Sequence, residues 1–167
     1  MNENPDYWIE KLRMTAHPEG GYYSEVYRSN ELITGLPGRY SGQRCFSTSI
    51  FFLLKNEEFS AIHRIRSDEI WHYYVGTSGV GIYMLEHSGK KNVRILGQEI
   101  GVGEELQVVI NAGNWFGAKQ IKQGSFALMG CTVAPGFEFK DFELGKRDEL
   151  IKTFPQHQAL IEMLTHT

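Results

Sequence analysis

The stretch HRIRSDEIWHYYVG, from His63 to Gly76, places two histidines and a glutamate within ten residues. Strand-like sequence flanks it on both sides, and RSD in its middle suits a turn. In such a hairpin, His63 near the end of one strand and Glu69 at the start of the next come together on one face. The stretch therefore predicts a metal site, an acid/base pair, or the polar seam of a packed barrel.

His72 is harder to place beside this pair. Residues 69, 71, 73 and 75 of a strand face one way, and residues 70, 72 and 74 face the other. His72 therefore joins Glu69 only if a β-bulge intervenes. We interpret His63 and Glu69 as the candidate catalytic pair and His72 as a conditional ligand-binding residue.

The rest of the chain is read as strands between two helical ends. Short runs rich in β-branched and aromatic residues recur from Tyr22 to about Leu144, cut by turn signals, which favours an antiparallel sandwich or barrel over βαβ units. Asn4 and Pro5 suit the start of a helix. We predict one mainly β domain over residues 1–167, with a sandwich or barrel over about 20–145 and short terminal helices over about 4–16 and 147–164.

The strand STSIFFLL, residues 47–54, is apolar on both faces. Phe51 and Leu53 form one set, and Ile50, Phe52 and Leu54 form the other, so the strand is expected to be covered on both sides. One side is the barrel interior. A partner subunit is a candidate for the other side, and we expect a homodimer.

Composition excludes several classes of protein. The chain has 167 residues, a net charge of −3 and scattered basic residues, which indicates no nucleic-acid or anionic-membrane surface. Its apolar runs are too short to span a bilayer, and its first residues, MNENPDYWIE, do not resemble a secretory signal. Two distant cysteines, Cys45 and Cys131, indicate neither a disulfide framework nor a zinc knuckle. We expect a cytoplasmic protein with a small-molecule ligand.

The residues of the opening stretch also resemble a known family. His63, Ile65, Glu69 and Gly76 have the spacing of the first cupin motif, H-x-H-x3-E-x6-G, with Ile65 where the second histidine would stand. The blocks HPEGGYYSEVYRS, SDEIWHYYVG and VAPGFEFKDFEL resemble the Cupin_5 family from about residue 7 to residue 144. The resemblance implies a cupin jelly roll, a dimer, and a pocket similar to that of the sugar-nucleotide epimerase branch.

The second cupin motif, P-x-G-x2-H, is similar to NAGNWFGAK, with Asn111 at the proline, Gly113 matching and Phe116 at the histidine. Two of the four usual cupin ligand positions are therefore Ile65 and Phe116. The two remaining ligands are fewer than the three that a catalytic zinc site keeps. We expect no bound metal and no other cofactor.

A His/Glu pair without a metal can still move protons, because burial raises a carboxylate's pKa and an adjacent imidazole lowers it. The resemblance implies a histidine base and a tyrosine acid, as in cupin epimerases. Tyr73, which shares the face of Glu69, and Tyr23 or Tyr27 of the first strand are candidate acids, and Arg28 is a candidate cation. Trp115 and Phe116 complete the candidate ligand-binding residues.

Two functions remain open from the sequence. The first is a metal-independent isomerase or epimerase that acts on a small polar or sugar-nucleotide-like molecule, with His63 as its base. The second is a non-catalytic cupin that binds a small ligand in the same pocket. The structural alternative is that His63 and Glu69 bond to each other and fill the barrel.

Overall fold

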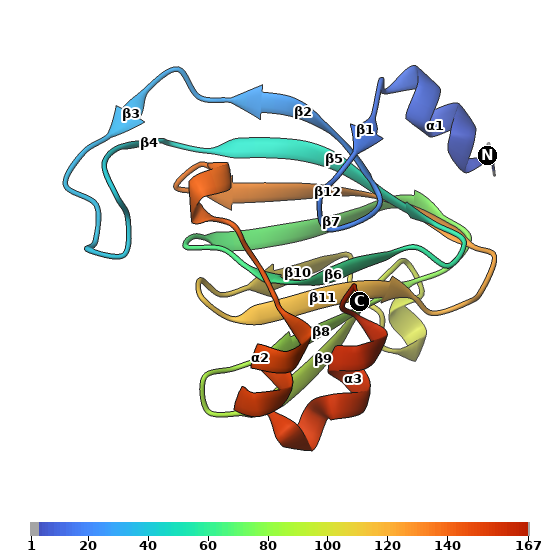
Figure 1. Cartoon of the computed structure of the whole chain (residues 1–167). Coiled ribbons are helices and arrows are strands. Elements are labelled where there is room, and N and C mark those ends of the chain that lie inside the picture. Colours follow the sequence, from blue (N-terminus) through green and yellow to red (C-terminus); the bar gives the residue numbers. More distant parts are fainter. Residues whose placement is uncertain (1–3, 167) are drawn as a thin grey trace.

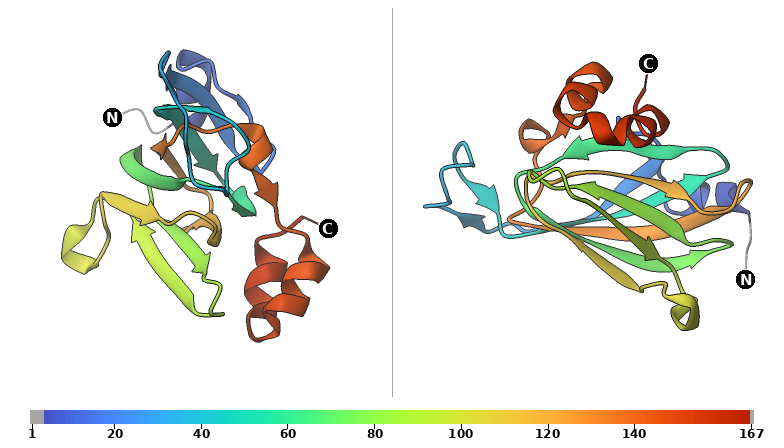
Figure 2. Two further views of the ribbon diagram at one scale, coloured as in Figure 1. Left: turned by 90° about the vertical axis from the view of Figure 1, so that its left-hand side faces the viewer. Right: turned by 90° about the horizontal axis from the view of Figure 1, so that it is seen from below.

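The fold consists of two antiparallel sheets packed face to face, as Figures 1 and 2 show for the computed structural model, which describes residues 4–166. The six-stranded sheet has the order β1 (Thr15–Ala16), β2 (Tyr22–Arg28), β5 (Thr48–Lys55), β12 (Phe126–Ala134), β7 (Asp68–Gly76) and β10 (Gln107–Ile110). The five-stranded sheet has the order β13 (Glu143–Leu144), β6 (Phe59–Arg64), β11 (Trp115–Gln120), β8 (Val80–Leu85) and β9 (Lys91–Leu96). The mainly β jelly roll predicted from the sequence is confirmed.

The main core lies between the two sheets. Its side chains alternate with outward-facing ones along each strand, as the period of a strand requires. Phe52 and Leu54 of β5, Trp71 of β7 and Phe116 of β11 are buried in this cluster. The core fills the middle and one end of the barrel and leaves the other end for polar side chains.

The N-terminal helix α1 (Pro5–Lys11) begins as the sequence predicts, with the Asn4 side chain accepting a hydrogen bond from the Asp6 amide at 3.0 Å. It ends at Lys11, well before residue 16, and β1 follows. Trp8, Ile9 and Leu12 pack with Leu53 on the outer face of the six-stranded sheet, where Figure 1 shows α1. The outer side of STSIFFLL is thus covered at Leu53 by the chain's own helix.

The C-terminal helices α2 (Arg147–Thr153) and α3 (Gln158–Met163), joined by the 3-10 turn η3 (Pro155–His157), cover the outer face of the five-stranded sheet (Figure 1). Leu150, Phe154 and Ile161 are buried there against Ile62 of β6. No helix among the described residues is long and apolar enough to cross a membrane.

Two short strands and two further 3-10 turns lie outside the main sheets. β3 (Leu32–Ile33) and β4 (Arg44–Cys45) form a hairpin that extends away from the barrel, as Figure 1 shows on its left side. The 3-10 turns η1 (Ile100–Val102) and η2 (Phe139–Asp141) interrupt the connections from β9 to β10 and from β12 to β13. Of these, the hairpin and η2 flank the open end of the barrel, where the candidate site lies.

Candidate active site

A cavity of about 160 Å³ occupies one end of the barrel between the sheets. Strands β2, β5, β6, β7 and β12 supply its walls, the loop before β2 closes one side, and the segment from residue 135 to residue 142 closes another. The candidate pair His63 and Glu69 lines this cavity together with Tyr23 and Arg28. Residues far apart in the sequence therefore meet in one enclosed space.

The loop His17–Gly21 adds two titratable side chains to the candidate pair. Its turn depends on Gly20 and Gly21, whose φ angles are +111° and +71°. A Cβ atom at Gly20 would lie 2.2 Å from the Phe59 carbonyl oxygen, so only glycine fits there. The Ala61 amide donates to the Glu19 carbonyl at 2.8 Å, which fixes the loop against β6. His17 and Glu19 are thereby turned into the cavity.

Glu19 bridges the two histidines of the cavity. Its Oε2 atom lies 3.3 Å from His63 Nε2 and 3.3 Å from His17 Nδ1, and its Oε1 atom accepts a hydrogen bond from Ser60 Oγ at 2.8 Å. Glu19 is 5% exposed, and this burial raises the pKa of its carboxyl group. A carboxyl group that keeps its proton can donate it to an imidazole lone pair.

His63 is held in one tautomer. Its Nδ1 atom lies 2.8 Å from the Ala61 carbonyl oxygen, which can only accept, so the proton of the neutral ring is assigned to Nδ1. Phe116 lies beneath the imidazole, with ring centroids 4.1 Å apart. Burial lowers the pKa of His63, opposed by the charge of Glu69. The neutral ring therefore presents a basic Nε2 lone pair toward Glu19 and the cavity.

Glu69 titrates near neutral pH. Burial raises the pKa of its carboxyl group from 4.5 to about 7, and the His63 ring opposes part of this shift while the charge of Glu19 adds to it. The Cys131 thiol of β12 also lines the cavity, and burial raises its pKa well above the usual value, so it stays protonated. At neutral pH, Glu69 can thus either accept or donate a proton.

Glu69→Gln is expected to change how stability depends on pH. The folded chain keeps a proton on Glu69 that the unfolded chain loses above about pH 4.5, so this group lowers the free energy of unfolding as pH rises from about 4.5 through 7. Glutamine removes this penalty. The difference in unfolding free energy between variant and wild type should grow by about 3 kcal/mol from about pH 4 to pH 8.

Urea denaturation of both proteins across this pH range measures that difference. Burial lowers the pKa of His17 and of His63, so both favour folding more as pH rises, the opposite sense to Glu69, but they are present in both proteins. Parallel pH profiles for the two proteins would contradict the assigned protonation of Glu69.

A bulge in β2 decides which of its side chains enter the cavity. The register of β2 against β5 shifts between Glu25 and Tyr27, so Val26 is the extra residue. Tyr23, Glu25 and Arg28 therefore face the cavity. Tyr27 is turned outward and is 53% exposed. It does not line the cavity, because the bulge reverses the alternation that the sequence suggested.

Four other candidate residues do not line this cavity. His72 is on the outer face of β7, where its Nε2 atom lies 3.1 Å from Thr132 Oγ1. Tyr73 points inward but toward the opposite end of the barrel, and its hydroxyl donates to the Ser78 carbonyl at 3.2 Å. Trp115 packs on the outside against the C-terminal helices, beneath the Arg64 guanidinium. Phe116 is buried under His63 and supports its ring.

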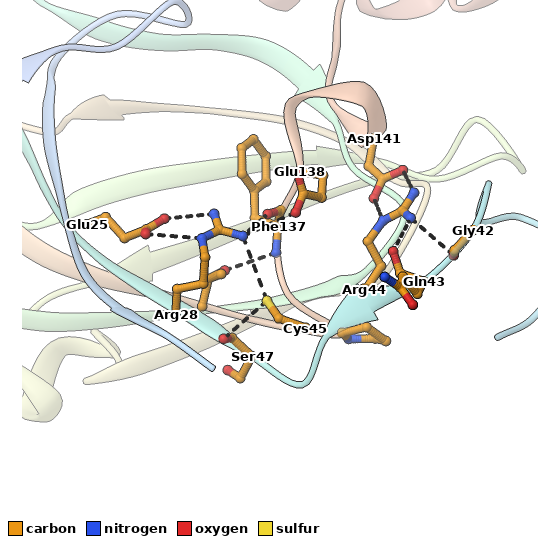
Figure 3. Close-up of polar contacts among 12 residues, drawn as sticks. Glu25, Arg28, Gly42, Gln43, Arg44, Cys45, Ser47, Phe137, Glu138 and Asp141 are labelled. Atoms are coloured by element: carbon orange, nitrogen blue, oxygen red, sulfur yellow. Dashed lines mark hydrogen bonds and ion pairs between the residues drawn. The ribbon is translucent and has the colours of Figure 1, made fainter. Parts of the chain in front are cut away.

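The segment after β12 forms an aromatic wall that Arg44 and Arg28 hold in place. Its rings belong to Phe137, Phe139 and Phe142. Arg44 of β4 makes two hydrogen bonds of 2.6 Å to Asp141 in this segment, and both side chains are buried (Figure 3). Arg44 also donates to three backbone carbonyls of residues 41–43. This ion pair fixes the aromatic wall to the β3–β4 hairpin.

The sequence reasoning did not single out the second histidine and the second glutamate of the site. His17 and Glu19 lie in HPEGG, which is part of a block that carried the family resemblance, but no role was assigned to these two residues. The two glycines were the available sequence signal for this placement. Consecutive glycines allow a tight turn that can redirect the residues before it toward the barrel. The aromatic wall lies in VAPGFEFKDFEL, a block that carried the resemblance but to which no role was assigned.

The side chains present do not fit a metal centre of the cupin type. Ile65 and Phe116 occupy two of its four ligand positions, and His72, which would have restored a third ligand, faces outward. Among residues 4–166, no group of three or more histidine, cysteine, aspartate or glutamate side chains could hold a metal ion.

Comparison with known proteins identifies the family. The model of the family Cupin_5, described as Cupin superfamily (DUF985), matches residues 6–145. The chain belongs to the Cupin_5 family. Among curated proteins, none matches this member. Two solved structures are similar over nearly their whole length: a hypothetical protein from Leishmania major and a protein from Shewanella oneidensis.

The Leishmania protein is 30% identical to this Cupin_5 chain, with a TM-score of 0.89 and coverage of 98% of this chain and 99% of that one. The Shewanella protein is 36% identical, with a TM-score of 0.88 and coverage of 99% of both chains. Oxalate decarboxylase from Bacillus subtilis shares 15% identity at a TM-score of 0.55, over 93% of this chain and 37% of that one. That last likeness establishes the cupin fold alone.

Proposed function

We propose that this Cupin_5 protein binds a small organic molecule in the barrel cavity and transfers a proton on it, in the manner of a metal-independent isomerase or epimerase. The observation that carries the proposal is the convergence of His63, Glu19 and Glu69 in one buried cavity that also contains Tyr23. Carboxyl groups with raised pKa values beside a neutral imidazole are typical of acid/base sites.

In this proposal His63 is the base. Its Nδ1–H is committed to the Ala61 carbonyl, so Nε2 takes a proton from the ligand. Glu19, at 3.3 Å from Nε2, exchanges that proton with the ring. Glu69 or Tyr23 returns a proton to the ligand from another wall of the cavity, because both face the same space. Arg28 also lines the mouth of the cavity, where it pairs with Glu25 and Glu138.

The alternative is a non-catalytic binding protein, and one observation favours it. The Arg28 guanidinium is engaged by Glu25, Glu138 and the Phe137 carbonyl oxygen, so the cation that an oxyanion requires is already paired. In a binding protein, His63 and Glu69 would contact the ligand without exchanging its protons.

Proton exchange separates the two functions. We would screen small hydroxy and keto compounds, amines and nucleotide sugars by thermal shift, and then follow each ligand by proton NMR in D₂O. An isomerase or epimerase exchanges a carbon-bound proton of its ligand for deuterium. A ligand that binds and keeps all its carbon-bound protons would favour the binding protein and contradict the proton-transfer proposal.

We also propose a homodimer formed through the outer face of the six-stranded sheet. Helix α1 covers one end of this face, but Tyr27, Tyr74 and Val109 remain 51–54% exposed on it. Exposed apolar side chains grouped on one face are typical of protein interfaces. In sedimentation velocity, wild type should be a dimer and Val109→Lys a monomer, while Val102→Lys, on η1 away from this face, should stay dimeric. Monomeric wild-type protein at micromolar concentration would contradict the proposal.

A further inference from the structure

The ion-pair cluster at the mouth of the cavity has one more carboxylate than cations, because Arg28 pairs with Glu25, which lines the cavity, and with Glu138 beside it. The Arg28 guanidinium donates from Nε and NH2 to the two carboxylate oxygens of Glu25, at 3.1 and 2.8 Å (Figure 3). Its NH1 group contacts the Phe137 carbonyl oxygen and Glu138 Oε1, each at 3.2 Å, and Cys45 Sγ at 3.8 Å. One cation therefore faces two carboxylates, and each of its three nitrogens already contacts an acceptor.

The remaining lining residues offer no charge to an anion. Arg28 is the one lysine or arginine among the described residues that line the cavity. Burial lowers the pKa values of His17 and His63, so both rings are neutral near pH 7. A phosphate or carboxylate group would enter beside Glu25 and Glu138 with no free cation to meet it, which is unfavourable in a partly desolvated site.

Aromatic rings make up much of the wall next to this negative mouth. Phe137, Phe139 and Phe142 line one side, and Tyr23 and Phe52 line the other. Neighbouring rings in the wall meet edge to face, as Phe137 and Phe139 do with centroids 5.1 Å apart at 80°. Phe139 and Phe142 also pack against the rings of His17 and His63. The face of an aromatic ring attracts a cation, and several faces around one space are typical of sites for substituted ammonium groups.

The size of the cavity sets a second limit. Its volume is about 160 Å³, and an engineered cavity of roughly 150 Å³ in another protein holds a benzene molecule. A nucleotide sugar is several times larger, so it could place only one end inside. We propose that the cavity binds a compact organic cation, a substituted ammonium compound, rather than a sugar nucleotide or a carboxylate. This inference rests on the proposed ligand-binding role of the same cavity.

Glu69 provides an independent readout of the charge of the ligand. The groups that face it are His63 of β6, Glu19 of the loop before β2, Cys131 of β12 and Trp71 of its own strand. Because its pKa is about 7, Glu69 is partly protonated at neutral pH. A cation bound nearby favours the carboxylate and releases a proton, whereas an anion favours the protonated form and takes one up.

The test uses three molecules of nearly the same shape that differ in charge: choline, 3,3-dimethylbutan-1-ol and 3,3-dimethylbutanoate. Isothermal titration of the whole protein near pH 7 should give choline about tenfold tighter binding than the neutral alcohol, with the carboxylate weakest. Repeating the choline titration in buffers of different ionisation enthalpy should show proton release. Equal binding of the three, tightest binding of the carboxylate, or no binding of choline overturns the inference.

Variants locate the effect at the mouth. Glu138→Gln removes one carboxylate that contacts only Arg28 among its described side-chain partners, and should weaken choline about three- to tenfold while leaving the neutral alcohol unchanged. Phe139→Leu should weaken choline more than the alcohol, because it keeps an apolar side chain and removes a ring face. Glu149→Gln, an equal change of charge on α2, should change neither. Unchanged choline affinity in Glu138→Gln and Phe139→Leu would overturn the assignment to this mouth.

The inference and the proposed function fail in different ways. Tight binding of anionic ligands, with His63-dependent proton exchange on one of them, would contradict the proposed cationic ligand. It would still support the proposed proton transfer. If choline binds as expected but no amine ligand exchanges a carbon-bound proton in D₂O, the proposed cationic ligand is supported. The proposed proton transfer is then contradicted. The two experiments therefore judge the charge of the ligand and the chemistry separately.

Discussion

His63→Asn is expected to slow the exchange of a carbon-bound ligand proton by about 10²–10⁴-fold while changing ligand affinity much less. Asparagine keeps a polar side chain of similar reach but has no basic nitrogen. The imidazole is buried, fixed by Ala61 and in contact with Glu19, so the variant has no basic nitrogen where His63 Nε2 stands. The rate is measured by proton NMR in D₂O, with affinity by titration.

His72→Asn is the matched control for this experiment. It makes the same substitution on the neighbouring part of the hairpin, but His72 lies on the outer face of β7 beside Thr132. It should leave exchange and affinity unchanged. A ligand that binds and exchanges equally in wild type, His63→Asn and Glu69→Gln would return both residues to a purely structural role. Loss of affinity in His63→Asn with no exchange in either protein would favour the binding protein instead.

Arg44→Met is expected to lower the free energy of unfolding by about 3–5 kcal/mol. Arg44 is 1% exposed, and its guanidinium makes both of its 2.6 Å bonds to Asp141. Methionine would leave the Asp141 carboxylate buried, with the nearest remaining cation at 3.8 Å in Arg66. An uncompensated buried charge is far more costly than the net worth of the pair, which is why removing one partner is so damaging.

Urea denaturation measures this change, and two further variants test its cause. Arg44→Met combined with Asp141→Leu should recover most of the stability, because no charge is then left buried. Lys146→Met breaks an exposed pair with Glu149 and should have little measurable effect. If the free energy of unfolding of Arg44→Met is within about 1 kcal/mol of the wild-type value, the Arg44–Asp141 ion pair is not a significant part of the fold's stability.

The hairpin that contains His63 and Glu69 could be predicted because it depends on local rules. Two strand-like runs around RSD fixed the turn, and the alternation along β7 correctly placed Glu69 inside and His72 outside. The spacing of the cupin motif then indicated that a jelly-roll barrel surrounds the two residues. The prediction depended on the two-residue alternation of side chains, which holds wherever a strand is regular.

Other parts of the site depend on interruptions that the sequence does not mark clearly. The bulge at Val26 reversed the faces of Tyr27 and Arg28, and nothing in YYSEVYR indicates where such a bulge falls. The approach of Glu19 to His63 requires contact between a loop and β6, which periodicity cannot reveal. The covering of Leu53 by α1 is likewise a tertiary contact, so the sequence left it open to a partner subunit.

The two arginine contacts on the aromatic wall also bear on how the protein folds during synthesis. Arg44 meets a residue 97 positions later, and Arg28 meets one 110 positions later. Contacts of such long sequence separation form slowly, because a long loop must close first. While the ribosome makes the first half of the chain, Arg28 can meet Glu25 and Arg44 can meet the carbonyls of residues 41–43, but their partners in the aromatic wall do not yet exist. The candidate site is therefore completed only after residue 142 has emerged, and a chain that stops before it lacks the aromatic wall of the cavity.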